Sequence, residues 1–139
     1  MSTITTVAVL GAGQMGAGIA HAVALGGYSV RLYDVAAARL PLAQGEIAAS
    51  LSRHVARGLI GQADADAALA RILPIETLAE AGGADLVIEA ATEDEAIKKS
   101  VFRDLTPHLG ADTLLASNTS SISITRLASV TDRPERFIG

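Results

Sequence analysis

The segment from Val7 to Gly18, which reads V-A-V-L-G-A-G-Q-M-G-A-G, constrains the fold more than any other part of the chain. An apolar run typical of a buried strand leads directly into three spaced glycines and then into a helix-compatible stretch. In such a unit Gly11 allows a tight turn, Gly13 lets a ligand approach the backbone, and Gly16 lets the helix pack closely. The free N–H groups and the positive dipole end of the helix favour phosphate. The segment therefore predicts a dinucleotide site.

An acidic residue further along the chain supports this prediction and indicates which dinucleotide is bound. The next predicted strand ends at Asp34, roughly 20 residues past the glycines, where a carboxylate accepts both hydroxyls of an adenosine ribose. The same carboxylate repels a 2′-phosphate, and Arg39, the nearest following cation, is expected to face solvent. We therefore predict NAD rather than NADP as the cofactor. As an alternative role, Asp34 is a candidate N-cap of the next helix, and the two roles are compatible.

Predicted strands and helices alternate along the chain, which is typical of a parallel sheet covered on both faces. A helix is predicted over Gln14–Leu25. The fold class is therefore α/β, a Rossmann-type doubly wound and mainly parallel sheet with a helical pair inserted between the second and third strands. The five predicted strands are Val7–Leu10, Ser29–Tyr33, Ile72–Ile75, Leu86–Glu89 and Leu114–Ser117.

The inserted helical pair occupies the long segment between the second and third strands. It runs over residues 36–70, is rich in Ala, Leu, Arg and Gln, and is interrupted at Gly58–Gly61. Because Pro41 lacks a backbone donor, it fits only in the opening turn of a helix, so the first helix is expected to begin near Val35 or Ala36.

A further helix is predicted over Glu95–Leu109, because apolar residues recur there at every fourth position. These residues are Ile97, Val101, Leu105 and Leu109, with Phe102 beside them.

Composition limits the classes of partner. With 139 residues, of which 50% are hydrophobic, the chain can build one compact core. A formal charge of −4 without a basic cluster argues against nucleic acid. No apolar run is long enough to span a membrane and no signal peptide is recognisable, so we expect a cytoplasmic protein. With no cysteine, neither a disulfide nor a thiolate is available, and no metal site is predicted. Because aromatic residues make up only 3%, a bound adenine is expected to lie between aliphatic side chains.

Four elements together resemble a known family. They are G-A-G-Q-M-G-A-G-I-A at residues 11–20, D-L-V-I-E-A-A-T-E at 85–93, Lys98, and A-S-N-T-S-S-I-S-I at 116–124. They resemble the NAD-binding domain of 3-hydroxyacyl-CoA dehydrogenases, including bacterial 3-hydroxybutyryl-CoA dehydrogenases. The resemblance implies that residues 1–139 form one NAD-binding domain, and that the complete enzyme oxidises L-3-hydroxyacyl-CoA to 3-oxoacyl-CoA by hydride transfer to NAD.

The resemblance also implies roles for individual residues. Ser120 matches the serine that hydrogen-bonds the substrate's 3-oxygen and orients it for hydride transfer, which makes it the predicted catalytic residue of this chain. Glu93 and Lys98 match residues near the nicotinamide. Ser50 and Arg57 match positions that contact coenzyme A, with Arg57 in place of the family's lysine. The residues predicted to bind the cofactor are Gly11, Gly13, Gln14, Met15, Gly16, Asp34, Ala90, Glu93, Lys98 and Asn118.

The same residues also have purely structural interpretations. The stretch Asn118–Ser121 is equally typical of a loop that leads into a helix, with Ser120 or Ser121 as the N-cap. Glu93 and Lys98 are equally typical of solvated charges in the first turns of a helix. Structural or solvated roles are expected for the three histidines, which are His21, His54 and His108.

The family's catalytic histidine lies in an H-x-F-N-P segment, and the sequence stops one residue short of it. The family's helical C-terminal domain is absent too. We therefore expect an N-terminal fragment that binds NAD with little or no turnover. Two alternatives stay open, a stand-alone NAD(H)-binding module and a related dehydrogenase of non-thioester hydroxy acids. The full-length protein is expected to be a homodimer, and the fragment to self-associate through an exposed sheet edge and helix face.

Overall fold

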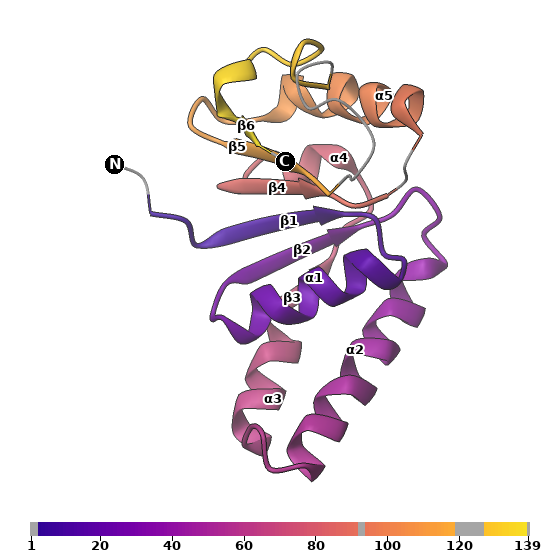
Figure 1. Ribbon diagram of the computed structural model, residues 1–139, viewed down its shortest axis with the longest axis vertical. Coiled ribbons are helices and arrows are strands. Elements are labelled where there is room, and N and C mark those ends of the chain that lie inside the picture. Colours follow the sequence, from indigo (N-terminus) through magenta and orange to yellow (C-terminus); the bar gives the residue numbers. More distant parts are fainter. Residues whose placement is uncertain (1–2, 92–93, 119–126, 139) are drawn as a thin grey trace.

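The computed structural model describes residues 3–91, 94–118 and 127–138 of the chain. Within these residues, six strands form one parallel sheet with the spatial order β3-β2-β1-β4-β5-β6 (Figure 1). The sheet grows outward from β1 in one direction and from β4 in the other, which is the order of a doubly wound Rossmann-type sheet. The predicted fold class is confirmed. The strands are β1 (Thr6–Leu10), β2 (Ser29–Tyr33), β3 (Ile72–Pro74), β4 (Leu86–Glu89), β5 (Leu114–Ser117) and β6 (Phe137–Ile138).

The strand predictions need only small corrections. The bounds of β2, β4 and β5 are as predicted, and β1 begins one residue earlier. β3 ends at Pro74 rather than Ile75, although the backbone N–H of Ile75 still donates to the Leu32 carbonyl at 2.9 Å. The prediction omitted β6, because two residues are too short for an alternating pattern to be visible.

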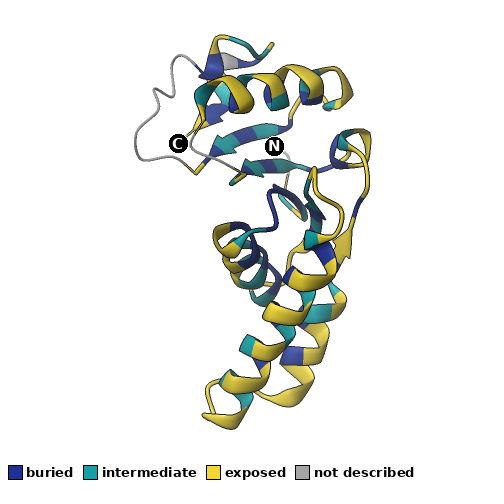
Figure 2. Cartoon of the chain, turned by 90° about the vertical axis from the view of Figure 1, so that its right-hand side faces the viewer, coloured by how far each residue is buried: buried dark blue, intermediate teal, exposed yellow. Residues whose placement is uncertain are grey.

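Helices cover both faces of the sheet. α1 packs against the sheet on one face, and α2 and α3 pack on α1 and on each other, extending beyond the sheet (Figure 1). Their outward surfaces are largely exposed (Figure 2). The helices are α1 (Gln14–Leu25), α2 (Arg39–Ala56), α3 (Gln62–Ala70), α4 (Leu78–Ala81) and α5 (Glu95–Leu105), with 3₁₀ turns η1 (Thr106–His108) and η2 (Pro134–Arg136).

Two apolar cores lie on the two faces of β1. Because successive side chains of a strand point to opposite faces, Val7 and Val9 enter the core shared with α1, α2 and α3. Ala8 and Leu10 enter the core shared with α4 and α5. β1 is therefore buried on both sides, and its carboxyl end is held between the two layers where the glycine loop begins.

The helical pair exists as predicted, but its first helix begins later. α2 starts at Arg39 rather than at Val35 or Ala36, because the chain first makes a turn in which the Arg39 N–H donates to the Ala36 carbonyl at 2.9 Å. The Asp34 carboxylate holds this turn by accepting the Ala36 N–H at 2.8 Å. Pro41 still lies in the opening turn of α2, which satisfies the constraint that its missing donor imposes.

The helix predicted over Glu95–Leu109 is shorter and faces differently. α5 ends at Leu105 and continues as the 3₁₀ turn η1, because Pro107 lacks the N–H that would extend the helical ladder. Ile97, predicted on the buried face, is 52% exposed, whereas Lys98 is completely buried. The buried face of α5 is therefore shifted by one residue from the apolar pattern, since a paired lysine occupies a core position.

Of the described helices, none combines the length and the apolar character that crossing a lipid bilayer requires.

Candidate dinucleotide site

The glycine loop joins β1 to α1 at the carboxyl edge of the sheet. Gly11 has a φ of +112°, and a Cβ there would lie 2.7 Å from the Ala91 Cα. A Cβ on Gly16 would lie 1.7 Å from the Gly11 carbonyl oxygen, so only glycine lets α1 approach the loop this closely. Gly13 differs from both, since a Cβ there would meet nothing within 4 Å. The loop is thus tightly packed at Gly11 and Gly16 and open at Gly13.

The N-terminus of α1, whose first backbone donors have no partner within the helix, lies beside this opening. Its N-cap is Gly13, which offers no side-chain cap, and its first turn holds no acidic residue. The first N–H groups of a helix lack intrahelical partners, and the helix dipole makes this end positive. Gln14 and Met15, which follow the cap, are exposed. The arrangement can bind an anion such as a pyrophosphate.

Asp34 lies next to the loop, at the end of β2. Its Oδ2 accepts the Ala12 N–H and its Oδ1 accepts the Ala36 N–H, both at 2.8 Å. Each carboxylate oxygen keeps acceptor capacity for a further donor, such as a ribose hydroxyl. The alternative that Asp34 caps α2 is wrong, because the N-cap position of α2 is Ala38 and no side chain accepts a capping hydrogen bond there.

The prediction that Arg39 faces solvent is wrong, because its side chain hydrogen-bonds the glycine loop. Its Nε and Nη2 donate to the Ala12 carbonyl at 3.1 and 2.7 Å, and Nη2 also meets Glu46 Oε1 at 3.4 Å. Helical spacing along α2 alone predicts a solvent-facing Arg39, but the free carbonyl of a glycine-rich loop attracts its guanidinium.

A small, largely apolar hollow lies beside Asp34. Its volume is about 210 Å³, and it is formed between the end of β2 and the first turns of α5. Val35 and Ile97 line it and are 83% and 52% exposed, so apolar side chains are available at its mouth. Tyr33 is the one aromatic residue among the described side chains that line it. The hollow can receive a flat apolar ring.

A buried charged cluster closes the carboxyl ends of β4 and β5. Lys98 from α5 forms an ion pair with Glu89, and both side chains are fully buried. The Ser117 hydroxyl donates to Glu89 Oε1 at 2.8 Å, and Lys98 Nζ lies 3.4 Å from the same hydroxyl oxygen. Glu89 Oε2 accepts the Ala91 N–H at 2.6 Å, and the Glu89 carbonyl accepts the Asn118 N–H at 2.8 Å. Glu89 thereby joins the loop after β4 to the segment after β5.

The solvated-charge alternative is wrong for Lys98, which is fully buried. The cluster also contains Glu89 and Ser117, which were not among the predicted site residues. The signal for Glu89 and Ser117 was present, since each is the polar last residue of an apolar parallel strand. Such strand ends meet at one edge of the sheet, where open α/β sheets bind ligands. Glu93 and Ser120, and the proposed cap at Ser120 or Ser121, lie outside the described residues.

Two further predicted residues lie at the same edge. The N–H of Ala90 donates to the Leu10 carbonyl at 2.8 Å, which ties the loop after β4 to the end of β1. Asn118 is exposed and directly follows β5.

A groove of about 660 Å³ runs between the start of α1 and α2. Ser50 lines this groove together with Arg53, one turn further along the same helix. Arg57, predicted to act with Ser50, is exposed at the C-cap of α2 and is not among the described residues that line it. The structure therefore brings Ser50 together with Arg53.

The histidines lie away from the buried charged cluster. His21 on α1 and His54 on α2 are half-buried, and their rings lie 5.2 Å apart between centroids with their planes tilted by 51°. Burial, and then the neighbouring His54, lower the pKa of His21. His108 is exposed in η1. His21 also lines the groove between α1 and α2, so the structural or solvated roles of the histidines stay a prediction.

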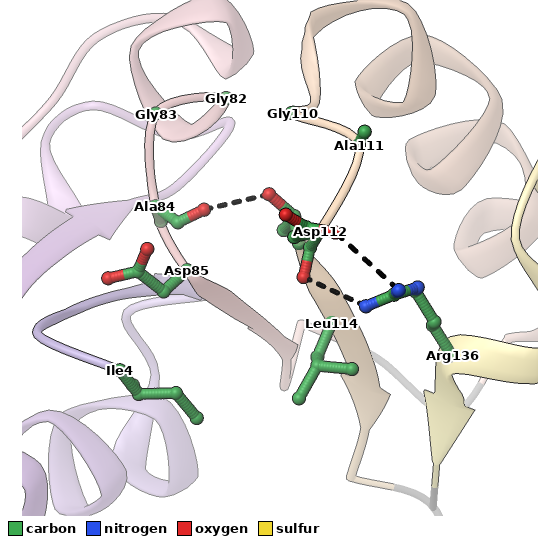
Figure 3. Close-up of a pocket in the computed structure, with 11 residues that line it drawn as sticks. Ile4, Gly82, Gly83, Ala84, Asp85, Gly110, Ala111, Asp112, Leu114 and Arg136 are labelled. Carbon is green, nitrogen blue, oxygen red and sulfur yellow. Dashed lines mark hydrogen bonds and ion pairs between the residues drawn. The ribbon is translucent and has the colours of Figure 1, made fainter. Parts of the chain in front are cut away.

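Another hollow, of about 650 Å³, lies at the opposite edge of the sheet, where β4 and β5 begin (Figure 3). Its charged groups are already paired, since Asp112 meets Arg136 at 3.5 Å and Asp85 accepts hydrogen bonds from Thr5 and Thr6. The backbone donors of Thr5 and Thr6 lower the pKa of Asp85. We therefore take the carboxyl edge as the candidate site.

A family model for the NAD-binding domain of 3-hydroxyacyl-CoA dehydrogenases matches residues 6–139. The chain belongs to this family. The prediction of an NAD-binding domain is confirmed, as is the family resemblance.

Two curated relatives and one solved structure indicate how close the similarity is. A 3-hydroxybutyryl-CoA dehydrogenase of Bradyrhizobium diazoefficiens is 48% identical over 138 residues, which is 99% of this chain and 47% of that protein. A 3-hydroxyadipyl-CoA dehydrogenase of Escherichia coli is 43% identical over 139 residues, all of this chain and 29% of that protein. The crystal structure of (S)-3-hydroxybutyryl-CoA dehydrogenase from Ralstonia eutropha is 41% identical, with a TM-score of 0.93 over 97% of this chain and 48% of that one. The chain thus spans about half or less of these relatives.

Proposed function

We propose that this chain is the cofactor half of an NAD-dependent L-3-hydroxyacyl-CoA dehydrogenase and binds NAD(H) at the carboxyl edge of its sheet. The observation that carries the proposal is the glycine loop, which is packed shut at Gly11 and Gly16 and open at Gly13, with Asp34 bound to the backbone between them. An open position facing an uncapped helix N-terminus is what a pyrophosphate requires.

The three parts of the adenosine diphosphate half of the cofactor each have a matching surface. The pyrophosphate lies against Gly13 and the first N–H groups of α1. The ribose hydroxyls donate to Asp34, whose carboxylate is already oriented by two backbone N–H groups. The adenine enters the apolar hollow between Val35 and Ile97, as expected for a chain with few aromatic residues. These groups bind and orient NAD, which when bound supplies the hydride acceptor.

The nicotinamide end is proposed to lie over the loops that Glu89 joins. Lys98, Ala90 and Asn118 belong to this region, and the family resemblance adds Glu93 there and Ser120 beside the substrate oxygen. Because Lys98 is fully buried and paired, we propose that it acts by holding these loops in place rather than by contacting bulk solvent. Ser120 remains the proposed substrate-orienting residue.

The acyl-CoA substrate, as 3-hydroxyacyl-CoA or 3-oxoacyl-CoA, is proposed to bind at the Ser50 and Arg53 end of the groove between α1 and α2, since the dinucleotide is proposed to take the part that Gly13 and Arg39 line. Ser50 offers a hydroxyl there and Arg53 a cation that suits a phosphate. Arg57 lies beyond the groove, so its contact with the substrate would be made by a part of coenzyme A outside it.

His21, His54 and His108 do not match the catalytic histidine that the family resemblance implies, so we propose that none of them accepts the proton in the oxidation. We therefore propose that the 139-residue chain binds NAD(H) with little or no turnover, and that the whole protein is needed for activity. Homodimer formation by the whole protein and a cytoplasmic location are part of the same proposal. Self-association of this chain is proposed through the outer edge of β6, where Ile138 is 54% exposed. Light scattering at rising concentration would detect it, and a single monomeric mass would contradict it.

Titration of NADH by the rise in its own fluorescence tests the cofactor proposal. We expect saturable binding to this chain, and Asp34→Ala should weaken it about tenfold or more, since a charge-assisted hydrogen bond is lost. Asp104→Ala, at an exposed position on α5, is the matched surface control. A folded chain that binds no NADH would overturn the proposal.

Competition with substrate analogues separates the acyl-CoA function from the two alternatives. We expect acetoacetyl-CoA to bind and Ser50→Ala with Arg53→Leu to abolish that binding, whereas acetoacetate alone should not bind. Binding of acetoacetate but not of the thioester would favour a dehydrogenase of non-thioester hydroxy acids. NADH binding with neither analogue would favour a stand-alone NAD(H)-binding module.

A further inference from the structure

We propose that Arg39 is a second determinant of which dinucleotide the site accepts, as a receptor for a 2′-phosphate that opposes the repulsion by Asp34. The inference rests on the proposed dinucleotide site and concerns its selectivity. It predicts that the ratio of the affinities for NAD and NADP is smaller than Asp34 alone would produce.

The two charged side chains bind the two ends of one residue of the glycine loop. Asp34 Oδ2 accepts the Ala12 N–H at 2.8 Å, and the Arg39 guanidinium donates to the Ala12 carbonyl at 2.7 and 3.1 Å. Both side chains therefore lie within hydrogen-bond reach of the residue before Gly13, and we infer that a 2′-phosphate on a ribose bound to Asp34 reaches the guanidinium. An acid that favours a 2′-hydroxyl and a cation that favours a 2′-phosphate thus stand at one subsite.

Arg39 is free enough to receive a phosphate. Its side chain is 33% exposed, and Glu46, its charged partner among the described residues, is 51% exposed at 3.4 Å, a geometry in which an ion pair contributes little. Its contacts within the described part of the chain use Nε and Nη2, and a guanidinium has further donors on Nη1. The planar fork matches a phosphate better than a lysine would.

A purely structural role for Arg39 predicts something different. If Arg39 only braced the loop through Ala12, its removal would weaken NADH and NADPH equally, because both coenzymes use the same pyrophosphate and the same loop. A role in binding the 2′-phosphate changes the ratio of the affinities for NADH and NADPH, whereas a purely structural role leaves that ratio unchanged.

The test measures dissociation constants of NADH and NADPH by coenzyme fluorescence for the wild type, Arg39→Leu, Asp34→Ser and the double variant. We expect Arg39→Leu to weaken NADPH about tenfold more than NADH. Asp34→Ser should strengthen NADPH about tenfold, and Arg39→Leu in that background should remove this gain. Arg103→Leu, on an exposed part of α5, controls for the loss of one positive charge, and circular dichroism checks that each variant is folded.

If wild-type NADPH binding is too weak to measure, the comparison of Asp34→Ser with the double variant still decides the test, because NADPH is expected to bind Asp34→Ser more tightly. Equal weakening of both coenzymes by Arg39→Leu, or retention of the NADPH gain in the double variant, would overturn the role of Arg39 while leaving the NAD site intact. Failure of the folded wild type to bind either coenzyme would overturn the proposed function itself, and this inference with it.

Discussion

The two halves of the carboxyl edge are built by different means. On the β1–β2 side the site consists of backbone, with glycines that are either packed shut or left open and with charges that hydrogen-bond the loop. On the β4–β5 side it consists of buried side chains, where Glu89, Lys98 and Ser117 satisfy one another away from solvent. We therefore expect substitutions on the β1–β2 side to affect mainly ligand binding or local packing. Substitutions on the β4–β5 side should affect the stability of the whole domain.

The largest effect is expected from breaking the buried ion pair. Lys98→Met should lower the free energy of unfolding by about 3–5 kcal/mol, because it leaves the Glu89 carboxylate buried without a countercharge. Glu89→Leu combined with Lys98→Met should regain part of that loss, since an apolar pair can replace a buried ion pair. Urea denaturation of the two variants measures both values. Wild-type stability of Lys98→Met would contradict the view that the buried side chains on the β4–β5 side stabilise the domain.

A smaller effect is expected from adding one methyl group in the glycine loop. Gly16→Ala should destabilise the domain by about 1–3 kcal/mol, because its Cβ would overlap the Gly11 carbonyl, which must then move. Gly18→Ala, two residues later in the same helix, is the matched control, since it meets nothing within 4 Å. It should stabilise the domain by about 0.5–1 kcal/mol through helix propensity. Equal effects of the two substitutions in thermal unfolding would contradict the packing role of Gly16.

Gly13→Ala should separate binding from stability. Because a Cβ at this position meets no neighbour, we expect the free energy of unfolding to stay within about 0.5 kcal/mol of the wild-type value, the usual range for a surface substitution. NADH binding should weaken about tenfold or more, since the methyl group would occupy the space proposed for the pyrophosphate. A loss of stability without a loss of binding would reverse the expected pattern on this side of the site.

The same contrast explains what the sequence could predict. The glycine loop, α1 and most strands were predictable, because they depend on local patterns of apolar residues and glycines. The contact of Arg39 with Ala12 was not, because it depends on how the start of α2 lies against the glycine loop. The groove that Ser50 and Arg53 line was not either, because it depends on how α2 packs on α1. The buried position of Lys98 shifted the face of α5, since a charge neutralised by a partner nine residues away in sequence behaves like a core residue. Long-range pairing of polar groups is what a periodicity argument leaves out.

The smallest expected effect concerns the histidine pair in the backbone-built half. Because the pKa of His21 is lowered below its ordinary value of 6.5, by burial and then by His54, the unfolded chain binds a proton more readily than the folded one as the pH falls through that region. The contribution of neutral His21 to stability is therefore complete above pH 6.5 and is lost as the pH falls toward its folded pKa.

Urea unfolding of the wild type and of His21→Gln at pH 7.5 and 5.5 measures this contribution. We expect the wild type to lose more stability on acidification than the variant, by no more than a few tenths of a kcal/mol, because water screens a half-buried pair. His108→Gln, an exposed histidine, should show the pH dependence of the wild type. Identical pH dependence in all three proteins would mean that the contact between α1 and α2 does not distinguish neutral from charged His21. In that case the two helices would pack on their apolar residues alone.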